Sequence, residues 1–440
     1  MKILFVSLGC DKNLTNSEEM LGLLYKNGFT FTDNEEEAEV IVVNTCAFIN
    51  DAKEESINTI IELAEYKKTG SLKALIVTGC LAERYKSEII KEIPEVDAVI
   101  GTSAYDEIVF AVNEAVKGKK TECYKDLNRL VETDADRIIT TGGYYAHLKI
   151  AEGCNKRCTY CIIPKMRGNY RSVPMEKLVK EAEYLAAKGV KELILVAQET
   201  TVYGIDLYGK KSLHILLDKL CEVKGIEFIR IMYCYPEEIY DELIYTIKNQ
   251  RKICKYIDMP IQHCNDEILK KMGRKTGKAQ LINMIERLRK EIPDIILRTT
   301  LISGFPGETD EQHEELMEFV DSMEFDRLGV FAYSPEEDTV AAEMDNQIEE
   351  SVKEDRRDEI MELQQEIAFE KGDSMIGREF VAIIEGKLAD ENAYVGRTYM
   401  DAPGIDGNIF ITTDEEIMTG DFVRVKVTGS LEYDLIGELL

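Results

Sequence analysis

Three cysteines stand close together in the middle of the chain and could hold a metal centre. They are Cys154, Cys158 and Cys161, which form the pattern CxxxCxxC. An iron–sulfur cube usually takes four cysteine ligands, so three thiolates bind three irons and leave the fourth iron open to a small molecule. A structural zinc site is the alternative, but such a site is closed by four ligands. The remaining alternative is a group of buried structural cysteines, which are common singly but rarely so clustered.

A second set of cysteines lies in the first hundred residues. Cys10, Cys46 and Cys80 each come just after a short apolar run, at residues 2–9, 40–43 and 74–77. The carboxyl ends of parallel strands meet at one edge of a sheet, so these cysteines should converge. We expect them to bind a second 4Fe–4S cluster, again with one open iron. Redox switching or buried packing is the alternative. The other cysteines form no ligand pattern: Cys123, Cys221, Cys234, Cys254 and Cys264.

The elements that must position these cysteines alternate between strands and helices. Such alternation predicts parallel sheets and an α/β fold. Residues 1–123 read as an open parallel-sheet domain, and residues 124–143 lack periodicity and read as a linker. Residues 144–372 contain six strand–helix units and a charged linking helix, which predicts a partial (βα)6 barrel. In such barrels the site lies at the carboxyl ends of the strands.

The last part of the chain has a different pattern. Residues 375–440 contain five short alternating strands with glycines at the turns, which predicts a small all-β barrel. This segment has five Lys and Arg against thirteen Asp and Glu, a net charge of −8. A barrel that tracks RNA should carry a basic face. An acidic barrel favours a basic protein partner instead.

The charge of the whole chain also favours a basic protein partner. The chain has 440 residues and a formal net charge of −29. Non-specific nucleic-acid binding depends on basic side chains that meet phosphate, so nucleic acid is disfavoured as the main partner. The alternative is that acidity only confers solubility. No apolar run is long enough to span a bilayer or to form a signal-peptide core, so we expect a cytoplasmic protein without membrane association. Eleven cysteines in that compartment favour metal binding over disulfides.

The motifs also resemble a known family. CxxxCxxC after an apolar strand resembles the radical S-adenosylmethionine enzymes. The segments Ser7–Asn13, Asn44–Cys46 and Thr78–Cys80 resemble the N-terminal motifs of one subgroup, the methylthiotransferases. Ser-Leu-Gly-Cys-x-Lys-Asn is typical of its ribosomal-protein branch (the RimO type), whereas the transfer-RNA branch (the MiaB type) has Gly-Cys-Gln-Met-Asn there. The C-terminal segment is similar in position and pattern to a TRAM domain, an OB-like barrel.

The resemblance implies a cofactor and residues that bind it. Gln198 and Glu199 follow a strand and could receive the ammonium group of S-adenosylmethionine. Arg298 could pair with its carboxylate, Gln262 follows the fourth barrel strand, and Tyr160 is placed to lie against the adenine. The alternative for each is ordinary capping or turn formation. Three basic residues after the cysteine loop could grip an acidic group or simply pin the loop: Lys165, Arg167 and Arg171.

The resemblance also implies an activity. It is the methylthiolation of the β-carbon of an aspartate in the basic small-subunit ribosomal protein S-twelve. It would use two 4Fe–4S clusters, S-adenosylmethionine and an electron donor of the flavodoxin or ferredoxin type. One S-adenosylmethionine would supply a methyl group, and another would be cleaved to a 5′-deoxyadenosyl radical that removes a hydrogen from the aspartate. Both clusters would then have to face one cavity.

Three alternatives stay open. A transfer-RNA adenosine methylthiotransferase has the same cysteine sets, but the acidic barrel and Ser-Leu-Gly-Cys argue against it. A two-cluster electron carrier would have four cysteines for each cluster. A non-catalytic ribosome-binding module would have no need of CxxxCxxC.

Overall fold

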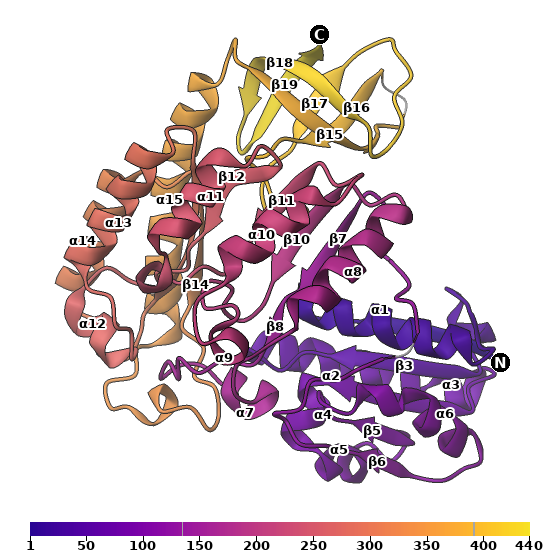
Figure 1. The fold of residues 1–440 in the computed structure, drawn as a ribbon. Coiled ribbons are helices and arrows are strands. Elements are labelled where there is room, and N and C mark those ends of the chain that lie inside the picture. The colour runs from indigo at the N-terminus through magenta and orange to yellow at the C-terminus, as the bar shows by residue number, and fades with distance from the viewer. Residues whose placement is uncertain (134, 390–391) are drawn as a thin grey trace. The chain divides into compact units, whose positions relative to one another are not determined.

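The computed structural model describes residues 1–133, 135–389 and 392–440 (Figure 1). The chain forms two compact units. The first comprises Met1–Thr140, Lys149–Val173 and Ser334–Ala342, and the second comprises Thr141–Leu148, Pro174–Tyr333 and Glu343–Leu440. The CxxxCxxC loop therefore belongs to the same unit as the N-terminal cysteines. The domain boundaries expected from the sequence, at 123, 144 and 375, stay a prediction.

The first unit is built on a parallel sheet with the strand order β2-β1-β3-β4-β5-β6. Its strands are β1 (Lys2–Ser7), β2 (Thr30–Phe31), β3 (Val40–Thr45), β4 (Ala74–Gly79), β5 (Ala98–Ile100) and β6 (Thr121–Cys123). Every residue of β3 and β4 is buried. Such continuous burial is expected of a parallel sheet that is covered by helices on both faces.

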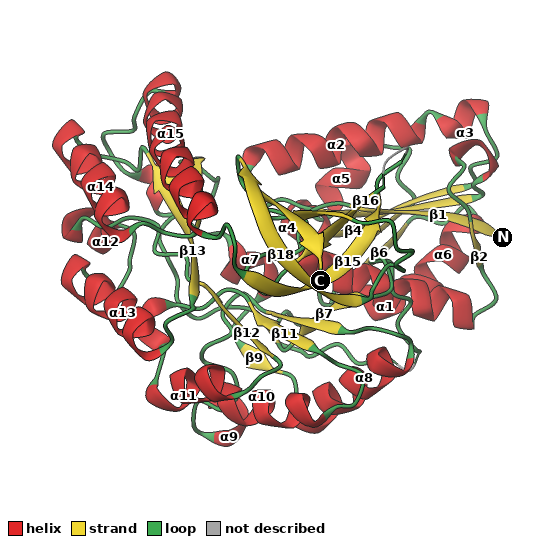
Figure 2. Cartoon of the chain, turned by 90° about the horizontal axis from the view of Figure 1, so that it is seen from above, coloured by secondary structure: helices red, strands yellow, loops and turns green. Residues whose placement is uncertain are grey.

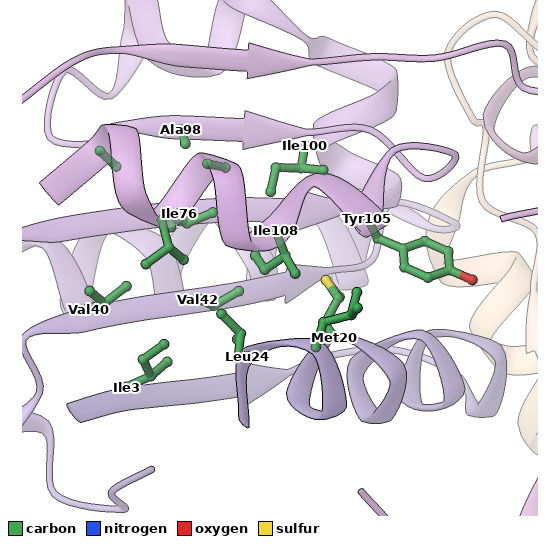
Figure 3. Close-up of a cluster of buried hydrophobic side chains, with 14 of the residues drawn as sticks. Ile3, Met20, Leu24, Val40, Val42, Ile76, Ala98, Ile100, Tyr105 and Ile108 are labelled. Carbon is green, nitrogen blue, oxygen red and sulfur yellow. The ribbon is translucent and has the colours of Figure 1, made fainter. Parts of the chain in front are cut away.

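Two hydrophobic clusters cover the two faces of this sheet, because alternate residues of a strand point to opposite sides. Figure 3 shows one of them, in which Met20 and Leu24 of α1 and Ile108 of α6 face Val42 and Ile76. The other cluster takes the alternate strand residues. The helices of this unit are α1 (Asp11–Lys26), α2 (Asn50–Ala64), α3 (Tyr66–Thr69), α4 (Cys80–Tyr85), α5 (Ser87–Glu92), α6 (Ile108–Val116) and α7 (Ile163–Arg167).

Some boundaries in this unit differ from the sequence expectation. The periodicity of residues 17–27 predicts a helix, but the helix in the structure begins at Asp11, directly after Cys10. Its first turns are polar yet buried, so hydrophobic periodicity did not reveal them. The pattern of residues 83–92 predicts one helix, but the structure has two there, because Lys86 between them has a left-handed backbone with φ of 48°. A short antiparallel pair, β8 (Ala151–Glu152) with β9 (Arg171–Ser172), closes the loop that carries the central cysteines.

The second unit contains a six-stranded open sheet in sequential order, β14-β13-β12-β11-β10-β7, as expected for a partial barrel. The pairs from β10 to β14 are parallel. The strands are β7 (Tyr145–Lys149), β10 (Glu192–Val196), β11 (Phe228–Ile231), β12 (Ile253–Asp258), β13 (Ile296–Ser303) and β14 (Arg327–Ala332).

Helices cover the outer side of this sheet, where Figure 2 shows them as an arc around the strands. They are α8 (Met175–Ala187), α9 (Ile205–Tyr208), α10 (Leu213–Glu222), α11 (Asp241–Asn249), α12 (Asp266–Lys271), α13 (Lys278–Glu291), α14 (Asp310–Met323) and α15 (Glu350–Ser374). In the described part of the chain, none of the helices has the length and apolar character that crossing a membrane requires.

The second unit ends in a closed five-stranded barrel, which confirms the all-β C-terminal domain. Its strands are β15 (Glu379–Lys387), β16 (Ala393–Arg397), β17 (Ile409–Thr412), β18 (Phe422–Leu431) and β19 (Asp434–Leu439). This barrel packs on the parallel sheet of its own unit through a shared hydrophobic cluster. Ile194, Tyr256 and Ile296 of the sheet meet Phe380 and Ile409 of the barrel there.

Candidate cysteine centres

The three N-terminal cysteines follow neighbouring strands of the first sheet. Cys10 comes after β1, Cys46 directly follows β3, and Cys80 directly follows β4. The chain order reverses between β1 and β3, and the crevice at such a switch point is where ligands of open α/β sheets bind. The Cys46 thiol lies against the residue before Cys10, since a Cβ at Gly9 would lie 3.1 Å from the Cys46 Sγ, and the Cys80 Sγ lies 3.9 Å from Asn13 Oδ1 at the same edge. That the three thiols bind one cluster stays a prediction.

Asn13 holds the three loops in place. Its side chain is fully buried, and its Nδ2 donates to the carbonyls of Leu8 at 3.1 Å and Thr45 at 3.0 Å. Its Oδ1 faces the Cys80 thiol at 3.9 Å. One amide thus reaches the loops after β1 and β3 and the cysteine after β4. The sequence motif contained Asn13, but only the structure shows that its side chain forms hydrogen bonds to more than one of these loops.

Two glycines allow the loops to approach so closely. Gly9 has a φ of +91°, and a Cβ there would lie 2.8 Å from the Cβ of Cys46. Gly79 has a φ of +94°, and a Cβ there would lie 2.3 Å from Asn44 Oδ1 and 2.5 Å from the Thr45 carbonyl. Both are left-handed conformations that side chains rarely adopt. At the positions before Cys10 and Cys80, the packing of this sheet edge therefore leaves no room for a side chain larger than that of glycine.

The central cysteines lie on one loop between β8 and α7. The Cys154 amide donates to the Gly168 carbonyl at 3.1 Å, and the Cys161 amide donates to the Cys158 carbonyl at 3.1 Å. Burial raises the pKa of the Cys161 thiol above its usual value, and the neighbouring Cys158 and Cys154 raise it further. Burial is the main cause and the neighbouring Cys80 thiol the second cause that likewise raise the pKa of Cys46 to about 12. A metal centre would have to displace these protons to bind.

Each of the two cysteine sets offers three thiols to a metal centre. In the described residues, no three His, Cys, Asp or Glu side chains converge as the ligands of one metal ion would. A 4Fe–4S cube takes one thiolate for each iron, so its cysteines surround the cube and need not meet at a point. Which metal the cysteines bind stays a prediction.

Most of the residues expected to bind S-adenosylmethionine lie in the second unit. Gln198 and Glu199 follow β10 and are buried. Gln262 has a left-handed backbone with φ of 72°, and its main chain bonds to Thr300 and Ile302 of β13. Ser303, at the end of β13, is fully buried, and its Oγ has no hydrogen-bond partner among the residues that the structure describes. A buried hydroxyl left in this way fits a polar ligand at the carboxyl ends of these strands.

Arg298 has partners within the protein. Its Nη1 donates to Asp258 Oδ1 at 2.8 Å, and its Nε donates to Asp406 Oδ1 of the C-terminal barrel at 3.2 Å. These carboxylates give Arg298 a structural role between sheet and barrel, and its contact with a cofactor stays a prediction. Tyr160 belongs to the first unit together with the cysteine loop and is partly buried.

The basic residues after the cysteine loop separate into two kinds. Lys165 donates to the Asp338 carbonyl at 2.9 Å, and Arg171 donates to the carbonyls of Arg129, Arg167 and Asn169, each at 2.8 Å. These two pin the loop. Arg167 differs, because its Nη2 donates to the Cys80 Sγ at 3.3 Å and also to Asn13 Oδ1. Sequence reasoning placed all three in one island and missed this contact, which no local pattern signals.

Comparison with known proteins divides the chain into three matched regions. Residues 2–101 match the model of the "Uncharacterized protein family UPF0004", residues 148–320 match the Radical SAM superfamily, and residues 376–440 match the TRAM domain. Among solved structures, the radical S-adenosylmethionine methyltransferase TsrM from Kitasatospora setae has a TM-score of 0.54 at 13% identity. It covers 76% of each chain. At that identity the likeness shows a shared fold only.

Curated relatives are much more similar. The ribosomal protein uS12 methylthiotransferase RimO of Lachnoclostridium phytofermentans is 63% identical over 99% of both chains. The RimO of Acetivibrio thermocellus is 52% identical over 100% of this chain and 98% of its own. Identity of this extent covers both cysteine regions and the C-terminal barrel. The chain therefore belongs to the RimO family of radical S-adenosylmethionine methylthiotransferases.

Proposed function

We propose that this protein transfers a methylthio group to the β-carbon of an aspartate in the small-subunit ribosomal protein S-twelve. The observation that carries the proposal is the pair of cysteine triads in one compact unit, each with three thiols and no fourth cysteine beside them in the sequence. The relatives named for this activity match the chain from end to end. A cytoplasmic location and an electron donor of the flavodoxin or ferredoxin type go with the proposal.

The residues have distinct tasks in this scheme. Cys154, Cys158 and Cys161 would hold one 4Fe–4S cluster, and Cys10, Cys46 and Cys80 would hold the other. When bound, the clusters and S-adenosylmethionine supply the radical and sulfur chemistry that no side chain provides. Gln198 and Glu199 would orient the cofactor at the ends of the barrel strands, with Ser303 as a further polar contact. Asn13 keeps the N-terminal cysteines in register with one another.

The charge of the chain supports a protein substrate over a nucleic acid. The C-terminal barrel carries five basic and thirteen acidic residues, and the whole chain has a net charge of −29. Such a surface attracts a basic ribosomal protein and repels phosphate. The transfer-RNA alternative lacks this support.

Mass analysis of a deletion strain tests the substrate. Ribosomal protein S-twelve should lose the mass of one methylthio group at its aspartate, whereas the transfer-RNA nucleosides should keep their normal modification. Complementation with the Cys158→Ala variant should fail to restore the mass. An under-modified transfer-RNA nucleoside together with normal S-twelve would reject the proposal in favour of the alternative.

Iron analysis tests the two centres directly. We expect about eight irons for each chain after anaerobic reconstitution, because two four-iron cubes bind. Replacing Cys10, Cys46 and Cys80 together by Ala should leave about four irons, since the central loop keeps its three thiolates. A matched control replaces Cys221, Cys234 and Cys254 by Ala and should keep about eight. Equal iron in the first variant and the wild type would contradict the second centre.

A further inference from the structure

Arg167 follows the central cysteine loop in the chain and contacts an N-terminal cysteine within the first unit. It is the last residue of α7, the helix that follows the CxxxCxxC loop, yet its guanidinium lies against the N-terminal cysteines. Its Nη2 donates to the Cys80 Sγ at 3.3 Å and also to Asn13 Oδ1. The side chain is buried, with 4% of its surface exposed. Water therefore screens this charge little.

Arg167 shares its directly paired carboxylate with a second cation. Glu152 Oε2 lies 3.4 Å from Arg167 Nη1 and is shared with the Lys149 ammonium, 3.2 Å away. Lys12 is paired with Asp11 at 2.9 Å, so that pair adds little net charge. The positive charge of Arg167 thus lies beside the Cys80 thiol, with Glu152 as a shared counter-charge and Glu83 as a further carboxylate within its electrostatic reach.

A buried guanidinium at this position changes the properties of a cluster. Three thiolates make a 4Fe–4S cube more negative, and each further electron or anion adds to that charge. Hydrogen bonds to the sulfurs and nearby positive charge stabilise the more negative state, and both are among the factors that set the reduction potential of a cluster. The Arg167 side chain supplies a hydrogen bond to a sulfur and a nearby positive charge.

We propose that Arg167 is a positioning residue of the N-terminal centre, which raises the reduction potential of its cluster and favours a small anionic sulfur ligand on the open iron. The inference rests on the proposed function, because it assumes that Cys10, Cys46 and Cys80 hold a cluster. It adds that the central cysteine loop, through α7, controls the chemistry of the other centre.

The test isolates the N-terminal centre in the full-length chain. Cys154, Cys158 and Cys161 are replaced by Ala, the protein is reconstituted anaerobically, and the midpoint potential is measured by electron paramagnetic resonance during a redox titration. Arg167→Gln should move the midpoint potential to a more negative value. The potential of Arg167→Lys should lie between those of Arg167→Gln and the unaltered centre, because Lys keeps the positive charge but loses the planar guanidinium and its several N–H donors. Glu152→Gln should move the potential the other way, since it removes the counter-charge.

The second readout is the binding of a thiolate. Sodium methanethiolate is titrated into the same proteins and followed by its effect on the cluster spectrum. Its dissociation constant should rise about tenfold or more in Arg167→Gln, which is the loss expected for a hydrogen bond to a charged group. Arg171→Gln is the matched control, because Arg171 follows the same loop and donates to the carbonyls of Arg129, Arg167 and Asn169. It should leave both readouts unchanged.

The outcomes separate the inference from the function beneath it. Unchanged potential and methanethiolate affinity in Arg167→Gln, with iron retained, would overturn the role of Arg167 and leave the proposed function standing. If Arg167→Gln loses its iron, the Glu152→Gln variant becomes the test. A midpoint potential of Glu152→Gln that does not rise above that of the unaltered centre would overturn the inference. No iron in the unaltered N-terminal centre would overturn both the inference and the second cluster.

Discussion

At the scale of single residues, the N-terminal centre depends on close approach more than on the cysteines alone. Asn13 bonds to two loop carbonyls, and Gly79 lies where a Cβ would meet Asn44 and Thr45. The loops after β1, β3 and β4 therefore have little room to shift. A substitution that leaves every cysteine in place can still separate the three thiols.

Replacing Gly79 by Ala should empty the N-terminal centre. The new Cβ would lie 2.3 Å from Asn44 Oδ1 and would also strain a φ of +94°, so β4 must move and carry Cys80 with it. We expect iron to fall from about eight to about four for each chain. The free energy of unfolding should fall by about 1–3 kcal/mol from backbone strain.

Gly118→Ala is the matched control. Gly118 has a φ of +78°, but a Cβ there meets nothing within 4 Å. This variant should show the strain in its unfolding free energy and keep all of its iron. Iron retained by Gly79→Ala would show that the edge of the sheet is less constrained than its packing indicates.

At the scale of elements, a buried ion network joins the parallel sheet of the second unit to the C-terminal barrel. Glu192 at the start of β10 accepts from Arg230 Nε of β11 at 3.0 Å and from Arg397 Nη2 of β16 at 2.7 Å. All three side chains are almost fully buried. Breaking such a network leaves uncompensated charge in the interior, which is costlier than the loss of a surface pair.

Glu192→Gln should destabilise the second unit by about 3 kcal/mol or more, because two buried guanidiniums lose their counter-charge. The measurement is urea unfolding together with hydrogen exchange of the β10 and β16 amides. Lys191→Ala is the control, since Lys191 pairs with Asp421 of the same barrel at 3.6 Å on the surface. It should cost about 0–1 kcal/mol. Equal effects of the two variants would contradict a special role for the buried network.

The same carboxylate predicts a dependence on pH. Burial acts to raise the pKa of Glu192, but the guanidiniums of Arg397 and Arg230 outweigh burial and hold that pKa below its usual value. A carboxyl whose pKa is lowered by folding stabilises the protein above its unfolded pKa, at about 4.3, and loses this stabilisation as the pH falls through the folded pKa. The difference in unfolding free energy between wild type and Glu192→Gln should therefore shrink below about pH 4.

At the scale of the whole molecule, the net charge of −29 affects the rate at which the protein associates with a charged substrate. A strongly acidic surface speeds the encounter with a basic protein, and salt screens this attraction over about 10 Å at 0.1 M. Charge of this kind acts on association rates and on the choice of partner. It does not determine the fold.

The association rate with isolated ribosomal protein S-twelve should fall about tenfold between about 20 mM and 200 mM salt. Stopped-flow mixing measures this rate. An acidic ribosomal protein of similar size serves as the control and should show no such acceleration at low salt. A rate for S-twelve that is independent of salt would contradict electrostatic attraction as the basis of recognition.

Much of this protein was determined by the sequence alone. The cysteine spacing, the strand–helix alternation and the five short C-terminal strands predicted the α/β fold and the closed barrel, because hydrophobic period and local turns are encoded in neighbouring residues. The placement of Cys10, Cys46 and Cys80 at strand ends also predicted that they meet, since parallel strands share an edge.

Only the tertiary structure decided which distant residues touch. Arg167 on the Cys80 thiol, Arg298 between Asp258 and Asp406, and Glu192 between two guanidiniums are contacts between segments far apart in the chain. A charged side chain in a sequence shows its charge but not its partner, because the partner is set by how strands, loops and barrel pack. Pairing across the fold is a property of the packed molecule, and it separated Arg167 from the loop-pinning Lys165 and Arg171.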